Sequence, residues 1–263
     1  MKNEIFSGFF GKRHCQGIAV DKKGGYIYYS FTTKLVKCDL EGNLVGTVEN
    51  IVGHLGCIDF NERDGRIYAS LEYKNDGIGR GILNAIGRAE SNARNGFYVA
   101  VFDVDKIDRE GLDAERDGVM RAVYLKDVVR DYEGFVQIGG ASIPHIHGCS
   151  GIDGLTFGRD FGATGGKYYL HVCYGIYSDI ERTDNDYQVI LQYDTDEWDD
   201  LEGPLAQDNI HTCGPEKPRR RYFVYTGNTT YGIQNFEYDE YTGITSPAFI
   251  PKKRKSSRII RRS

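Results

Sequence analysis

The sequence predicts an all-β protein built from repeated four-stranded antiparallel units. Three observations favour this fold class. The 263 residues include 33 glycines, 19 tyrosines and 13 phenylalanines, a composition typical of short strands joined by tight turns. The apolar runs are short and are separated by Gly, Asp and Asn, as expected of β-hairpins. Similar runs recur at a spacing of roughly 40 residues, which indicates an internal repeat.

The first predicted unit begins at residue 16. Its strands are expected at residues 16–21, 26–31, 34–39 and 44–48. These runs are rich in β-branched and aromatic residues, and the turns between them contain Gly24, Gly25 and Gly42. Such a pattern predicts an antiparallel meander in which each strand pairs with the next.

The second unit restarts at Gly56, and the step from Ile18 to Ile58 falls within the roughly 40–45 residues of one propeller blade. Its strands are expected at residues 56–61, 66–71, 96–103 and 120–125. An insertion at about 74–96 interrupts the pattern. Within the insertion, residues 82–90 are expected to form a short helical stretch.

The third unit is expected to place its strands at residues 154–158, 167–174, 187–194 and 221–225. A fourth unit begins with the apolar run 232–239, and its second strand should follow at once. Pro247 and Pro251 flank the stretch in question, where strand pairing needs free N–H groups. We therefore expect no second strand there. A reading-frame change or an early stop near residue 245 would explain its absence.

These boundaries predict one domain over residues 1–245 and a basic tail without fixed structure over residues 246–263. The domain is expected to be a propeller-like array of three units plus the start of a fourth. Such an array is incomplete relative to a closed ring.

The repeated pattern resembles the blades of β-propellers. It looks most like the broad NHL, YncE and SMP-30/gluconolactonase-like group. The resemblance is carried by Gly17–Asp21 and by Asp153–Gly158, and it covers about residues 14–243. It implies that the first strand of each unit lines a central channel. In the SMP-30-like enzymes a divalent cation lies at the channel mouth, bound partly by Asn or Asp just before the Gly-Leu of that strand.

By this resemblance, Asp153 occupies the cation-binding position of its unit. Gln16 holds a comparable place in the first unit, and Gln234 and Asn235 do so in the fourth. The second unit offers His54 and Asp59 instead. One acid per site falls short of the 6–8 oxygen ligands that calcium usually takes.

Two histidines precede Asp153. In an extended strand, His145 and His147 would project from the same side, and with Asp153 they would form a 2-His-1-carboxylate set for a transition metal. The alternative is that both lie in an exposed loop or hydrogen-bond to backbone between units. The cofactor expected from these residues is a divalent cation, either calcium or a transition metal.

Other constellations favour structural interpretations. Cys149 and His147 are too close in sequence to predict a catalytic dyad, and no G-x-S-x-G motif is present. Gly77–Gly81 fits neither G-x-G-x-x-G nor a P-loop and is expected to be a flexible insertion. The acidic run 194–200 lacks the spacing of an EF-hand loop and is expected to be solvated.

Charge and composition limit the partners. No window of 18 apolar residues exists and the N-terminus lacks a secretory apolar core, so a membrane partner is not expected. Six cysteines without a C-x-x-C pair favour reduced thiols in a cytoplasmic protein. Residues 252–263 hold seven of the 33 basic residues, which leaves 26 basic against 38 acidic side chains before them. Such an acidic body does not suit nucleic acid, for which only the tail is basic.

Two functional classes follow. The first is a binding domain that holds a small molecule, a metal ion or a protein partner at the channel mouth. The alternative is a metal-dependent hydrolase of the lactonase or esterase type, with Asp153 and the nearby histidines at the metal. Because one fold supports many functions, the repeats alone do not choose between them, and the sequence assigns no catalytic residue.

Overall fold

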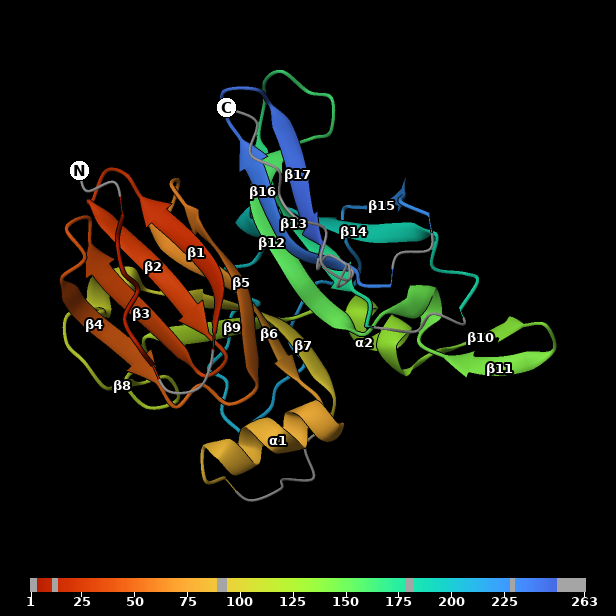
Figure 1. Ribbon diagram of the computed structural model, residues 1–263, viewed down its shortest axis with the longest axis horizontal. Coiled ribbons are helices and arrows are strands. Elements are labelled where there is room, and N and C mark those ends of the chain that lie inside the picture. Colours follow the sequence, from red (N-terminus) through yellow and green to blue (C-terminus); the bar gives the residue numbers. More distant parts are fainter. Residues whose placement is uncertain (1–3, 11–13, 89–93, 178–181, 228–229, 250–263) are drawn as a thin grey trace, which may run out of the picture.

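The computed structural model describes residues 4–10, 14–88, 94–177, 182–227 and 230–249 (Figure 1). These residues form three successive antiparallel sheets and the first hairpin of a fourth. The predicted all-β, propeller-like array of four-stranded meanders is therefore confirmed. The sheets follow the order of the chain, so each unit is built from a continuous segment.

The first sheet has the order β1-β2-β3-β4. Its strands are β1 (Cys15–Asp21), β2 (Tyr26–Phe31), β3 (Lys34–Asp39) and β4 (Leu44–Glu49). A short strand from the second unit, β8 (Leu112–Asp113), pairs in parallel with β4 and extends this sheet by one strand. The second unit thus reaches back and covers the outer edge of the first.

The second and third sheets repeat the meander. The second contains β5 (His54–Asn61), β6 (Arg66–Tyr73), β7 (Gly96–Phe102) and β9 (Met120–Tyr124). The third contains β12 (Gly151–Arg159), β13 (Tyr168–Gly175), β14 (Tyr187–Tyr193) and β15 (Arg220–Tyr225). Periodicity and turn chemistry located all eight strands, although β5 and β12 begin earlier than predicted.

The fourth unit differs from the prediction. Its inner strand, β16 (Ile233–Asp239), pairs with β17 (Ile244–Phe249), so the expectation that no second strand forms is wrong. Pro247 lies opposite Phe236 in a strand whose one partner in the described structure is β16. An edge strand tolerates proline where the missing N–H would face away from the sheet. Residues 246–249 therefore belong to β17 and not to a tail, while residues 250–263 lie outside the described residues.

The insertion forms α1 (Gly77–Ala85), which begins five residues earlier and ends five residues earlier than the predicted helix at 82–90. Asp76 caps this helix, because its carboxylate accepts a hydrogen bond from the backbone N–H of Gly79 at 2.8 Å. A Cβ on Gly79 would collide with the carbonyl oxygen of Lys74, so the helix can approach β6 only with glycine there. Gly77–Gly81 is thus the start of a helix and not the expected flexible insertion.

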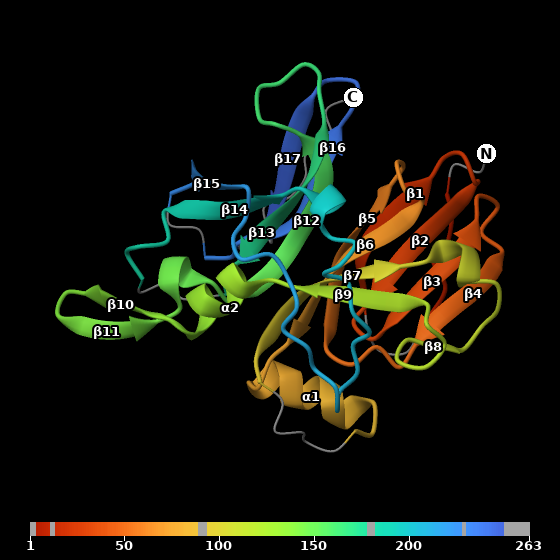
Figure 2. The ribbon, with the colours of Figure 1, turned by 180° about the vertical axis from the view of Figure 1, so that it is seen from behind.

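Several short elements between the second and third units were not predicted. They are α2 (Lys126–Glu133) and the hairpin of β10 (Phe135–Ile138) and β11 (Ala141–Pro144). The hairpin extends away from the sheets in Figure 1 and in the reverse view of Figure 2. Arg221 of β15 fixes α2 by contacting Asp131 at 2.5 Å and Asp127 at 3.1 Å.

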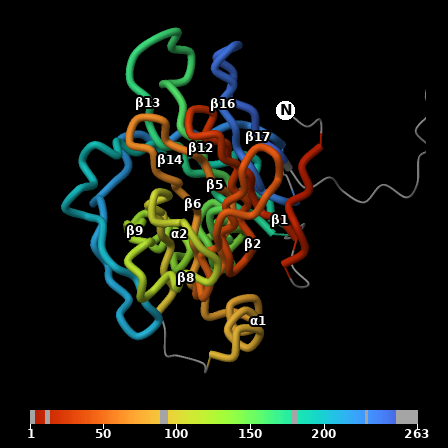
Figure 3. The backbone as a smooth tube through the Cα atoms, turned by 90° about the vertical axis from the view of Figure 1, so that its left-hand side faces the viewer, coloured from red at the N-terminus to blue at the C-terminus, as the bar shows by residue number. Residues whose placement is uncertain are grey.

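The first strands of the four units lie side by side. β5 packs against both β1 and β12, and β12 packs against β16 (Figure 1, Figure 3). Each of these inner strands carries a β-bulge near its start. The bulged residues are Gln16, Gly56 and Cys57, Asp153, and Gln234. A bulge leaves its extra residue outside the ladder and changes the direction of its side chain. By strand register, the equivalent positions in the four units are Gln16, Gly56, Asp153 and Gln234.

Apolar cores fill the spaces between successive sheets. One cluster joins the first and second sheets and includes Tyr28, Leu35, Ile67 and Leu71. Another joins the second and third sheets and includes Tyr68, Phe97, Leu155 and Val172. Each sheet is therefore stabilised by its neighbour, as expected of repeats that cannot bury their faces alone.

Side-chain hydrogen bonds also link one unit to the inner strand of the next. Ser30 donates to the carbonyl oxygen of Gly56 at 2.6 Å. The carboxylate of Glu72 accepts from the N–H of Ile152 at 2.5 Å, and that of Asp59 accepts from the N–H of Phe157 at 2.7 Å. Neighbouring inner strands belong to different sheets, so these bonds satisfy backbone groups that no ladder satisfies.

Replacing Gly17 with alanine should destabilise the protein, because the new Cβ would lie 2.8 Å from the backbone nitrogen of Ile58 on the neighbouring inner strand. We expect a loss of about 1–3 kcal/mol in the free energy of unfolding, measured by urea denaturation. Gly77→Ala is the control, since its Cβ meets no atom within 4 Å, and should change stability by less than about 0.5 kcal/mol. Equal losses in the two variants would contradict close packing of the inner strands.

Candidate functional site

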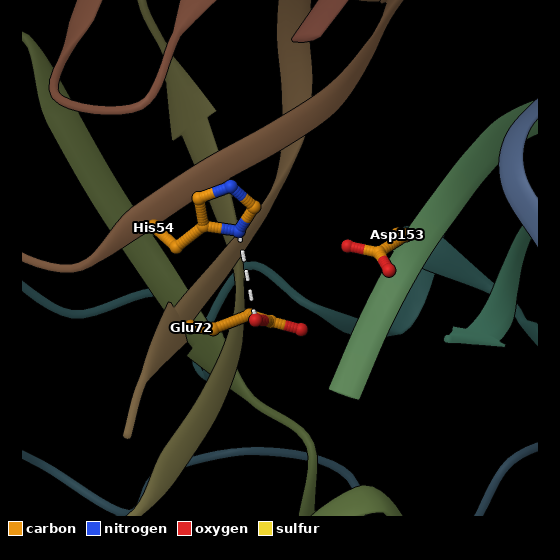
Figure 4. A group of neighbouring side chains, drawn as sticks. All are labelled: His54, Glu72 and Asp153. Carbon is orange, nitrogen blue, oxygen red and sulfur yellow. Dashed lines mark ion pairs between the residues drawn. The ribbon is translucent and has the colours of Figure 1, made fainter. Parts of the chain in front are cut away.

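Three metal-ligating side chains converge near the starts of the inner strands. His54 begins β5, Glu72 is near the end of β6, and Asp153 is the bulged residue of β12. Their ligand atoms all lie within 4.8 Å of one another, and Figure 4 shows the three side chains directed into a common space. We call these three residues the acid–histidine cluster. Within the described ranges, no other group of three or more His, Cys, Asp or Glu side chains converges in this way.

Glu72 is the buried centre of the cluster. One carboxylate oxygen accepts the N–H of Ile152, and the other lies 2.7 Å from Nζ of Lys74 and 3.6 Å from Nδ1 of His54. Burial by itself would raise the pKa of Glu72, but Lys74 and His54 outweigh it and hold that pKa below its usual range. A Cβ on Gly151 would collide with this carboxylate, so glycine leaves the space that Glu72 fills.

Asp153 is also buried. Its Oδ2 accepts hydrogen bonds from Nε2 of Gln234 at 2.9 Å and from the hydroxyl of Tyr177. Burial and the nearby charge of Glu72 raise the pKa of Asp153 to about 6. No described group donates to its Oδ1, so this oxygen is available to a ligand. The contact with Gln234 joins the bulged residues of the third and fourth units.

Lys74 places a cation beside the cluster. Its ammonium donates to the carbonyl oxygen of Ser150 at 3.2 Å and lies 5.3 Å from the ring centre of Tyr177. Burial would lower the pKa of Lys74, but the charge of Glu72 outweighs this effect and raises it. For His54, burial also lowers the pKa, while the contact with Glu72 and the charge of Asp153 raise it overall. The cluster is therefore partly neutralised by the protein itself.

Sequence reasoning missed Glu72 and Lys74. The available signal was an acid within the mostly apolar run Ile67–Tyr73, followed two positions later by a lysine. Residues two apart in a strand share a face. An acid on a buried face therefore needs a partner, and Lys74 supplies it.

His145 and His147 do not join the cluster. They lie at a 3₁₀ turn, η2 (Ile146–Gly148), and have positive φ angles of 67° and 55°, so the premise of an extended strand is wrong. Nδ1 of His145 lies 2.5 Å from the carbonyl oxygen of Tyr132, whereas His147 packs against Phe223. The structure thus does not form the predicted 2-His-1-carboxylate set with Asp153. Cys149 is buried, and burial raises its thiol pKa, which disfavours a nucleophilic role.

The remaining predicted ligand-binding residues lie at different places along the inner strands. Gln234 contacts Asp153, whereas Gln16 donates to the hydroxyl of Thr32 at 3.5 Å. Asn235 accepts from the thiol of Cys57 at 3.1 Å and so joins β16 to β5. Asp59 lies farther along β5, where it lines a cleft at the opposite ends of the inner strands. The predicted ligand-binding residues thus divide between two ends of the array.

Comparisons with known proteins show no family. No protein-family model and no curated protein matches the sequence. Among solved structures, the computationally designed Ika4 protein gives a TM-score of 0.29 at 10% identity, covering 95% of this chain and 100% of that one. The Dos1 propeller gives 0.33 at 10% identity, covering 89% and 52%. A eukaryotic initiation factor gives 0.25 at 8% identity, covering 92% and 54%.

Likenesses with such TM-scores carry no argument about this chain. The propeller-like fold is supported by the sheet order and by the packing of the inner strands. The specific NHL, YncE or SMP-30-like assignment stays a prediction of the sequence. Within the described residues, no helix combines the length and apolarity needed to cross a membrane.

Asp59 should make stability depend on pH. Burial, together with the charge of Glu237, raises the pKa of Asp59 from 3.8 to about 7 in the folded protein. Because the folded state then binds this proton more tightly, the stabilisation is present below about pH 4 and is lost as the pH rises through 7. Asp153 acts in the same direction over a lower window, ending near its pKa of about 6.

The Asp59→Asn variant should flatten this profile, since its amide oxygen can still accept the N–H of Phe157 but does not titrate. Urea unfolding at pH 5 and pH 8 should show that the wild type loses on the order of 2 kcal/mol more than the variant. Parallel profiles would show that Asp59 is not responsible.

Proposed function

We propose that this chain is a propeller-type binding domain whose acid–histidine cluster holds a divalent transition-metal ion. The observation that carries this proposal is the convergence of His54, Glu72 and Asp153 from three strands of two units, within 4.8 Å of one another. Local sequence does not require such a convergence, because Asp153 is about 80 residues beyond Glu72 in the chain.

The three side chains offer ligands that suit a transition-metal ion of intermediate hardness. One imidazole and two carboxylates are ligands of zinc and of other first-row transition metals. Calcium takes 6–8 oxygen ligands, which this set does not supply. A bound ion would supply positive charge and Lewis acidity at the junction of the second and third units. The chain's own contribution is to hold Glu72 through the N–H of Ile152 and Asp153 through Gln234.

Lys74 competes with a metal for Glu72. In the folded chain its ammonium already contacts that carboxylate at 2.7 Å, so an incoming ion must share or displace this contact. The competing hypothesis is therefore a purely structural ion pair, in which Lys74 is the sole counter-charge of the cluster. A decisive experiment must separate these two roles.

The hydrolase alternative has less geometric support. Neither of the described clefts is lined by His54, Glu72 or Asp153. An ion fits such a cluster, whereas an organic substrate needs an adjoining hollow. Metal-dependent lactone or ester hydrolysis therefore stays a prediction of the sequence, to be checked by assaying the metal-loaded chain against the Asp153→Ala variant.

The Lys74→Met variant should distinguish a metal site from a purely structural ion pair. Without its ammonium, Glu72 and Asp153 share a buried site with no permanent cation, so the apo variant should lose about 3–5 kcal/mol of stability. Zinc should restore most of this loss, and metal analysis after dialysis should find about one ion per chain. The restored stability is measured by urea unfolding with and without Zn²⁺.

The matched control is Lys37→Met, which also removes a buried ammonium, one that donates to the carbonyl oxygen of Val104 at 2.8 Å. It retains all six cysteines, so zinc binding by thiols would affect both variants alike. Zinc should rescue Lys74→Met but not Lys37→Met, and adding His54→Ala should abolish the rescue. A Lys74→Met variant that zinc does not stabilise would refute the metal site.

A further inference from the structure

The inner strands enclose a second site at their far ends. A cleft of about 340 Å³ is lined by residues of β1, β5, β12 and β16. We call it the distal cleft, because the acid–histidine cluster lies near the starts of these strands. Its volume is within the lower part of the range for small-molecule pockets, roughly 300–1,000 Å³.

Part of the wall of the distal cleft is apolar. Ile18 and Val20 of β1 line it and remain 55% and 39% exposed, although Ala19 between them is buried. Phe60 and Phe157 add aromatic surface from β5 and β12. Strand residues that expose apolar side chains beside a hollow are a feature of ligand sites, where the ligand completes their burial.

A positioned carboxylate occupies this cleft. Asp59 accepts hydrogen bonds from the N–H groups of Phe60 at 2.8 Å and Phe157 at 2.7 Å, and from the hydroxyl of Thr156 at 3.0 Å. These three donors come from two inner strands and fix the carboxylate before any ligand arrives. Such preorganisation lowers the entropic cost of binding.

A second carboxylate, that of Glu237 on β16, also lines the cleft. No described cation lies within ion-pairing distance of it. Its charge acts on Asp59, and burial raises the pKa of both carboxyl groups. Bringing a cation into the cleft would favour the ionised form of both groups.

The other charged groups of the distal cleft are mostly engaged. Glu62 pairs with Lys23 at 3.3 Å, and Arg63 pairs with Asp196 at 3.1 Å. Glu240 accepts the hydroxyl of Tyr168 at 3.3 Å. Lys22 also lines the cleft, and its charge acts on Glu237. The balance around the hollow is therefore negative.

We propose that the distal cleft binds a small organic cation, a primary ammonium attached to an apolar or aromatic body. The ammonium would donate to Asp59 and Glu237, which come from two different inner strands. Its three N–H donors suit two separate carboxylates. The apolar body would pack against Ile18, Val20 and Phe157, completing the burial of the exposed strand residues. This site is independent of the proposed metal ion, since the two share no residue.

The probe is 2-phenylethylamine, compared with its neutral counterpart 2-phenylethanol and the anion 3-phenylpropionate. Binding to the full chain is measured by calorimetry and by NMR chemical shifts of the cleft residues. The amine should bind saturably, the alcohol about tenfold or more weakly, and the anion not detectably, because charged hydrogen bonds carry the recognition. Equal affinity for amine and alcohol, or no saturable binding of the amine, would overturn the proposal.

Variants locate the site. Glu237→Gln should weaken amine binding about tenfold or more, whereas Glu62→Gln should change it less than about twofold. Glu62 is the matched control, because it lines the same cleft but pairs with Lys23. Asp59→Asn should weaken binding in the same way, with folding checked by its melting curve.

Two further measurements separate the proposals. His54→Ala should leave amine binding unchanged, so failure of the metal site would not affect this result. Ca²⁺ at equal concentration should not displace the amine. Displacement would assign the two carboxylates to a metal ion and overturn the proposal.

Discussion

The structure depends on how neighbouring inner strands meet. They approach closely through glycines such as Gly17, yet they belong to separate sheets and share no hydrogen-bonded ladder. Their backbone N–H groups therefore need acceptors from side chains. Glu72 supplies one to Ile152, and Asp59 supplies another to Phe157. Both candidate sites are thus built around an acid that already has a structural role in the fold.

The two acids are balanced in different ways, and this sets what each end of the array can bind. Glu72 carries its own counter-ion in Lys74, which lies within 2.7 Å and favours the ionised form. Asp59 has no cation at ion-pairing distance among the described residues, and its pKa is raised by burial and further by the like charge of Glu237. A buried charge is costly unless it is paired. One end therefore has a cation paired with its central acid, whereas at the other end no described cation pairs with Asp59 or Glu237.

Much of the fold was predictable because its determinants are local. Alternation and turn residues located the strands of the first three units, and the step from Ile18 to Ile58 gave the repeat. Pro247 misled the prediction, since a proline argues against a strand only where both edges are paired. For the sites, His54 and Asp153 were named, but Glu72 and Lys74 were not. Glu72 and Lys74 contact residues of the third unit. Which residues of two units lie beside each other depends on how the units pack, and a single sequence does not reveal this. His145 and His147 failed because positive φ angles break the extended geometry assumed for them.

The repeated bulge has a consequence for how such a chain can change. A bulged residue makes no regular ladder contact, so its side chain can vary while the strand keeps its register. The four units place Gln16, Gly56, Asp153 and Gln234 at this one position. Amides, a carboxylate and a glycine without a side chain already occur there on the same backbone. A substitution at the bulged residue of any one repeat can therefore change the functional group presented there without disturbing the pairing of the strands.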